Sequence, residues 1–154
     1  MMRKLLVVII LILGVAASLL TPHKALASII HTYETSVKIN PDGTIGVKET
    51  VLYDFEDEWK HGIYRIIPYV KVNENNESFD MTITDISVHD EAGNSYTQKI
   101  DDEGDQINIR VGDPDKTITG KHYYVIVYKV AGALTYFDTF DELYWNMTGN
   151  SWNS

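Results

Sequence analysis

The feature that most constrains the fold of this chain is an alternation of apolar and polar side chains with a period of two residues. After residue 28, runs rich in Val, Ile, Thr and Tyr recur with turn residues between them. Successive side chains of a strand point to opposite faces, so such runs predict strands with one buried and one exposed face. No apolar stripe with helical spacing extends far. About eight evenly spaced strands predict an all-β chain, an antiparallel two-sheet β-sandwich of the immunoglobulin-like type.

The first two runs show the alternation most clearly. Residues 33–39 and 45–55 both alternate, and Asn40-Pro41-Asp42-Gly43 separates them. Pro fixes φ and Gly tolerates a positive φ, so this tetrapeptide is typical of a turn. The two runs are therefore predicted to form a β-hairpin.

Three later features predict details of the strands. Pro68 limits the strand that begins at Ile63 to an edge, or ends it. The apolar parity changes within residues 81–89, and a bulge near Thr84 or Asp85 would reconcile the two halves. Residues 123–130 are apolar on both parities, which predicts a central strand covered on both sides.

The N-terminus predicts export. Basic residues Arg3 and Lys4 precede an apolar run of residues 5–20, and Ala25-Leu26-Ala27 fits a signal peptidase. Residues 1–27 are therefore predicted to be a signal helix that is cleaved before Ser28, and an uncleaved anchor is the alternative. Either way the predicted location is the cell membrane, with the domain of residues 28–154 exported through the Sec route to the extracytoplasmic side.

Charge and cysteine content exclude some classes of partner and bond. The chain has 13 basic and 22 acidic residues, and loss of Arg3, Lys4 and Lys24 with the signal leaves 10 basic residues and a net charge of −12. Nucleic acid is bound through clustered Lys and Arg, so it is not an expected partner. The chain has no cysteine, so its stability must come from the core rather than from disulfides.

Glu49 stands out because it occupies the apolar parity of its run, between Val47 and Val51. A buried carboxylate needs a partner, and Arg65, in an apolar run of its own, offers two parallel hydrogen bonds. We predict a structural ion pair of Glu49 and Arg65, with Glu142 as a competitor for the guanidinium. The alternative is that Glu49 and Glu142 are the acid/base pair of a glycoside hydrolase, which requires a cleft.

Aromatic residues cluster near the C-terminus and raise the possibility of sugar binding. The possible ligand-contacting rings are Tyr144, Trp145 and Trp152, and core packing is the alternative for each of them. Neither the acidic turns nor the widely spaced histidines follow the pattern of a metal site, and no nucleotide-binding loop or nucleophile motif is present. The expectation is that the chain has no catalytic residue, metal or cofactor.

Several segments together resemble one known family, in the same order along the chain. These are Asp42-Gly43 with Val47-Lys48-Glu49, Gly62-Ile63-Tyr64-Arg65-Ile66-Ile67-Pro68, Arg110-Val111-Gly112-Asp113-Pro114-Asp115, Thr119-Gly120-Lys121-His122-Tyr123 and Asp141-Glu142-Leu143-Tyr144-Trp145-Asn146. The chain resembles the N-terminal domain of the predicted membrane proteins of domain of unknown function 2207. The resemblance implies an extracytoplasmic β domain followed by transmembrane helices, so the chain is interpreted as truncated at its C-terminal end. It implies no activity.

Three functions follow as hypotheses. The first is a non-catalytic interaction or sensor domain of a cell-envelope membrane protein, whose partner is an unknown protein or cell-wall ligand and which contacts the membrane through its signal segment and the missing helices. The second is a module that binds cell-wall glycan. The third is the hydrolase that uses Glu49 and Glu142.

Overall fold

The structure is a computed structural model that describes residues 28–72, 76–148 and 152–153. The all-β prediction is confirmed, because every regular element in these residues is a strand. No helix in this part of the chain could cross a membrane. The signal helix and cleavage site predicted for residues 1–27 lie outside the described residues.

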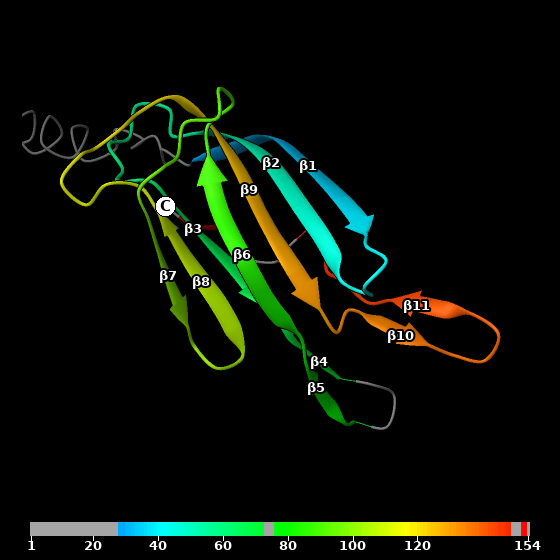
Figure 1. The fold of residues 1–154 in the computed structure, drawn as a ribbon. Coiled ribbons are helices and arrows are strands. Elements are labelled where there is room, and N and C mark those ends of the chain that lie inside the picture. Colours follow the sequence, from blue (N-terminus) through cyan, green and yellow to red (C-terminus); the bar gives the residue numbers. More distant parts are fainter. Residues whose placement is uncertain (1–27, 73–75, 149–151, 154) are drawn as a thin grey trace, which may run out of the picture.

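Four long strands form the first antiparallel sheet, and its spatial order is β1-β2-β9-β6 (Figure 1). The strands are β1 (Ile29–Ile39), β2 (Ile45–Asp54), β9 (Lys121–Ala131) and β6 (Thr82–His89).

The second four-stranded sheet is also antiparallel, in the order β12-β3-β8-β7. Its strands are shorter, namely β12 (Trp152–Asn153), β3 (Ile63–Pro68), β8 (Gln106–Val111) and β7 (Gln98–Asp102). β3 ends at Pro68, which agrees with the prediction that this proline limits the strand to an edge or ends it.

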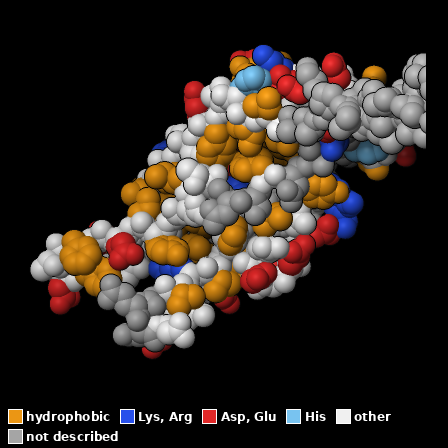
Figure 2. All heavy atoms as spheres, turned by 180° about the vertical axis from the view of Figure 1, so that it is seen from behind, with side chains coloured by type: hydrophobic (Ala, Val, Ile, Leu, Met, Phe, Trp, Pro, Cys, Tyr) orange, Lys and Arg blue, Asp and Glu red, His pale blue; other side chains and the backbone are white. Residues whose placement is uncertain are grey.

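Two small hairpins project from one end of the molecule (Figure 1). One pairs β4 (Val70–Val72) with β5 (Ser78–Asp80), and the other pairs β10 (Leu134–Tyr136) with β11 (Asp141–Leu143). Lys71 Nζ donates a hydrogen bond of 2.9 Å to Thr135 Oγ1 and so connects them. Hydrophobic side chains gather at this end (Figure 2), and they include the exposed rings of Phe79, Tyr136, Phe137 and Phe140.

The predicted hairpin of residues 33–55 is confirmed, since β1 pairs with β2 from Ile39↔Ile45 onward. The turn between them forms because Gly43 adopts a φ of 77° and its N–H bonds to the Asn40 carbonyl at 3.1 Å. Asp42 Oδ1 accepts hydrogen bonds from Thr44 N and Oγ1, which hold its carboxylate ionised and lower the pKa of Asp42 to about 2.

The predicted bulge is also confirmed. The register of β6 against β9 shifts between Thr84 and Ser87, and Asp85 has a φ of 55°. The central place of β9 is confirmed too, because β2 and β6 flank it. The prediction that β9 is covered on both faces holds fully for one face only. The even-numbered side chains from Tyr124 to Val130 are buried, whereas Val127 on the other face is partly exposed.

Both large sheets contribute to one hydrophobic core. From the first sheet it receives Ile45, Val47, Val51, Tyr124, Ile126 and Val130, and from the second Ile63, Ile67, Ile107, Ile109 and Val111. Burial of apolar surface is the main favourable term in folding. The apolar side chains of this shared core therefore determine which face of each sheet points inward.

Candidate functional site

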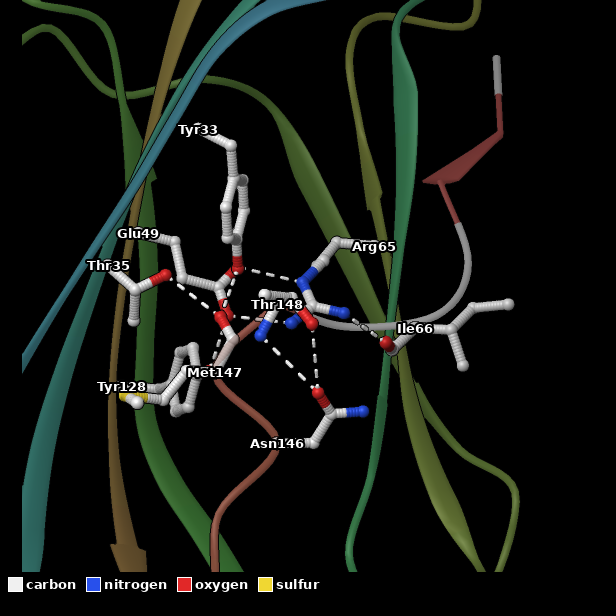
Figure 3. A network of polar contacts seen from close by, with 9 residues as sticks. All are labelled: Tyr33, Thr35, Glu49, Arg65, Ile66, Tyr128, Asn146, Met147 and Thr148. Carbon is white, nitrogen blue, oxygen red and sulfur yellow. Dashed lines mark hydrogen bonds and ion pairs between the residues drawn. The ribbon is translucent and has the colours of Figure 1, made fainter.

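Two charged side chains are buried in the described part of the chain, Glu49 and Arg65. Glu49 comes from β2 and Arg65 from β3, so their contact joins the two large sheets (Figure 3). Arg65 Nε donates to Glu49 Oε2 and Arg65 Nη2 donates to Glu49 Oε1, both at 2.7 Å. The exposed fractions of the two side chains are 0% for Glu49 and 1% for Arg65.

The alternation of each strand places this pair. Glu49 shares the inward parity of Val47 and Val51, and Arg65 shares that of Ile63 and Ile67. A shift of one residue in either strand would turn its charge outward and its apolar neighbours into solvent. The pairing of the sheets thus decides the position of both charges.

A third buried group, Tyr128 of β9, completes the bonding of the carboxylate. Its hydroxyl donates to Glu49 Oε1 at 2.6 Å, and Arg65 Nη1 donates to the Ile66 carbonyl at 2.5 Å. Burial alone would lower the pKa of Arg65, but the hydrogen bonds and negative charge of Glu49 outweigh it and raise that pKa. Burial, with the Glu49 charge added, raises the pKa of the Tyr128 hydroxyl. The guanidinium is therefore charged and the phenol neutral.

The C-terminal segment, residues 146–148 and 152–153, lies beside the ion pair. The Met147 carbonyl accepts hydrogen bonds from Tyr33 Oη at 2.8 Å and from Thr35 Oγ1 at 2.9 Å, both on β1. The Trp152 ring lies 4.8 Å from Arg65 Cζ and 5.6 Å from the Tyr33 ring. A cation over the face of an indole is attracted by its ring electrons. The Met147 contacts with β1 are drawn in Figure 3, and the Trp152 ring adds a contact with Arg65 of β3.

The prediction that Glu142 competes for Arg65 is wrong. Glu142 is exposed in β11, on a projecting hairpin, and Arg65 bonds to Glu49 and to the Ile66 carbonyl instead. The alternation of apolar and polar residues within one strand does not show where a short hairpin lies relative to a distant strand, so the sequence could not place Glu142 relative to Arg65.

The three rings predicted to contact a ligand do not share one surface role. Tyr144 is 46% exposed, whereas Trp145 and Trp152 are partly buried. Trp145 packs against the Tyr128 ring at 5.9 Å, and Trp152 packs on Arg65. The core-packing alternative therefore describes both tryptophans.

Sequence reasoning missed Tyr128 as a member of this network, although a signal for it was present. Tyr128 lies on the buried parity of a central strand, and a buried phenol usually needs a hydrogen-bond partner. It pairs with Val47 across the sheet, two residues from Glu49. That proximity follows only from the strand order, which the sequence does not state.

The arrangement fits a structural role better than acid/base chemistry. Glu49 is fully buried and accepts bonds from Arg65 and Tyr128, so it has no open face toward a substrate. A glycosidase needs two carboxylates flanking a bond in a cleft, and Glu142 lies on a hairpin outside the two large sheets. Among the described residues, no group of three or more His, Asp or Glu is placed to hold a metal ion.

The buried tyrosines predict a loss of stability at high pH. Burial raises the pKa of Tyr124 and of Tyr128 above the ordinary value of 10.0. Above about pH 10 the unfolded chain releases protons that the folded chain keeps, so the free energy of unfolding falls as pH rises, by about 1.4 kcal/mol per pH unit for each such tyrosine. Urea unfolding at pH 8, 10 and 11 measures this, with absorbance at 295 nm to follow ionisation. Equal stability at pH 8 and pH 11 would contradict it.

A family model described as "Predicted membrane protein (DUF2207) N-terminal domain" matches residues 29–154 of this chain. The chain belongs to this family. The match includes both large sheets and the ion pair between them. The predicted resemblance is thereby confirmed, and the family is described as one of membrane proteins.

A relative has a partial match to the chain. It is "Uncharacterized protein YciQ" of Escherichia coli (strain K12), which is 26% identical over 125 residues, or 80% of this chain and 20% of that protein. The chain thus spans about a fifth of the length of this relative. No solved structure matches the chain.

Proposed function

We propose that the chain is a non-catalytic interaction or sensor domain on the extracytoplasmic side of a cell-envelope membrane protein. The observation that carries the proposal is the Glu49–Arg65 ion pair. Glu49 and Arg65 are the buried charged residues of the described part of the chain, and they bond to each other and to Tyr128, which leaves the Glu49 carboxylate no open face for catalysis. The family description as membrane proteins supports the location.

The same proposal includes a finer fold, an immunoglobulin-like sandwich. The shared core and an ion pair between strands of different sheets support the face-to-face packing of two antiparallel sheets. Sandwiches of this kind present loops and hairpins at their ends, where partners bind. In this chain the hairpins β4–β5 and β10–β11 occupy one such end.

Binding of cell-wall glycan is the second candidate function. It is favoured by aromatic rings on the surface, which include Trp59 at 71% exposure and Tyr136 at 64%. Exposed rings of this size are costly to leave in water and are a common platform for sugars and other ligands.

Labelling of cysteine in intact cells tests the location. The printed chain has no cysteine, so one introduced residue gives one thiol. We expect the exposed Ser87→Cys to react with a membrane-impermeant maleimide in unbroken cells. The buried Val130→Cys is the matched control, and it should react only after denaturation. Reaction of Ser87→Cys only after the membrane is permeabilised would place the domain in the cytoplasm and refute the proposal.

A further inference from the structure

A hollow of about 600 Å³ lies on the outer face of the second sheet, beside the first residues of β3. This is the end of β3 away from the projecting hairpins (Figure 1). Gly62 and Gly112 lie in its lining. A volume of this size is ordinary for a small-molecule site.

A row of three side chains crosses the sheet in this hollow. Tyr64 of β3 is paired with Arg110 of β8, and Arg110 is paired with Lys99 of β7. All three are exposed and alternate with the buried Ile63, Ile109 and Val111. Strand alternation therefore directs all three toward the same outer surface.

The charge of the hollow is opposite to that of the chain. The chain has 22 acidic and 13 basic residues, yet the lining includes Lys60, Lys99 and Arg110 and no Asp or Glu. Glu58 and Asp101, which lie outside the lining, form ion pairs with Lys60 at 3.3 Å and with Lys99 at 2.6 Å. Arg110 has no ion-pair partner within the part of the chain that the structure describes. Its guanidinium is thus free to accept an external anion in a bidentate contact.

Two aromatic rings accompany this cation. The Trp59 side chain is 71% exposed and the Tyr64 side chain is 37% exposed, and both line the hollow. The faces of such rings pack against the apolar C–H face of a sugar, while a guanidinium fork matches a carboxylate. A peptide made of acidic residues alone would use the cation but would leave the rings without an apolar partner.

We propose that this hollow binds an acidic saccharide, a sugar chain whose rings carry carboxylates. One ring packs on Trp59 or Tyr64, and its carboxylate binds the Arg110 guanidinium with Lys99 and Lys60 nearby. This inference rests on the proposed function of a non-catalytic binding domain and gives that domain a site and a ligand class. The site differs from the C-terminal rings that the sequence suggested.

Titration calorimetry of the full exported chain tests the proposal with trigalacturonate as the probe. We expect saturable binding that weakens as salt rises, because screening acts on exposed charges. Arg110→Gln should weaken binding at least roughly tenfold, equivalent to about 1.4 kcal/mol, and Trp59→Ala should weaken it several-fold. Lys38→Gln, which removes an exposed charge from β1 outside the lining, is the matched control and should bind as the unaltered chain does.

Two comparison ligands test the ligand class. Neutral galactotriose lacks the carboxylates, and a triglutamate peptide lacks the sugar rings, so we expect both to bind at least tenfold more weakly than trigalacturonate. The proposal is overturned by no binding of trigalacturonate, by equal binding of either comparison ligand, or by Arg110→Gln and Trp59→Ala variants that bind normally. The cysteine labelling in intact cells is independent of these results, so the location can hold while the ligand class fails.

Discussion

Replacement of Arg65 by alanine is expected to lower the free energy of unfolding by about 3–5 kcal/mol, because the Glu49 carboxylate then stays buried without its counter-charge. Domains of this size are stable by only about 5–15 kcal/mol in total. The variant should therefore melt more than roughly 10 °C lower. Urea unfolding at pH 7, followed by tryptophan fluorescence, measures the loss.

Two control variants separate the buried charge from the arginine itself. Arg110→Ala removes the same side chain from an exposed position of β8 and should change stability by about 0.5 kcal/mol or less. The double variant Glu49→Leu with Arg65→Met removes both charges and should recover part of the loss, since a buried ion pair is often replaceable by apolar side chains. If Arg65→Ala left the melting curve unchanged, the ion pair would not contribute to the stability of the fold.

Alternation alone led to the pairing of Glu49 with Arg65. Each residue interrupts an apolar parity, and two opposite charges on inward faces of one core have few other partners. The hairpin of residues 33–55 and the bulge at Asp85 were predictable for a similar reason, since turn residues and a change of parity are local signals.

The cover of the pair by the C-terminal segment was not predictable in this way. Trp152 meets Arg65 because β12 joins the edge of β3, over 80 residues away in sequence. Only two residues of that strand are paired, too few for a recognisable alternation. Glu142 was misplaced because of the same lack of long-range information. The sequence identified which side chains face inward, and the strand order then decided which of them meet.

The second large effect is expected at Gly62 and Gly112, where the two backbones approach too closely for a side chain. A Cβ added to Gly62 would lie 1.9 Å from the Val111 carbonyl oxygen, and one added to Gly112 would lie 1.8 Å from the His61 carbonyl oxygen. Both obstacles are backbone atoms, which no rotamer change can move. The φ angles of 138° and 135° are also unfavourable for any residue with a Cβ.

Gly62→Ala should therefore cost more than about 4 kcal/mol, in the range reached only by severe packing or backbone defects. To fit a methyl group, the start of β3 would have to move away from the end of β8, where Ile63 pairs with Val111. Arg65 lies two residues further along β3 and would lose its position opposite Glu49. Soluble yield and urea unfolding of the variant domain measure the effect.

Gly104→Ala is the matched control for the backbone angle. Gly104 has a φ of 90°, but nothing lies within 4 Å of an added Cβ, so its substitution carries only the conformational cost of about 1–2 kcal/mol. The difference between the two variants then reports mainly the close approach of β3 and β8, beside the smaller effect of their different φ angles of 138° and 90°. Equal losses in Gly62→Ala and Gly104→Ala would show that the φ angle accounts for both and that the strands can separate at little cost. A larger loss at Gly62 would mean that this close contact holds the start of β3 against the end of β8.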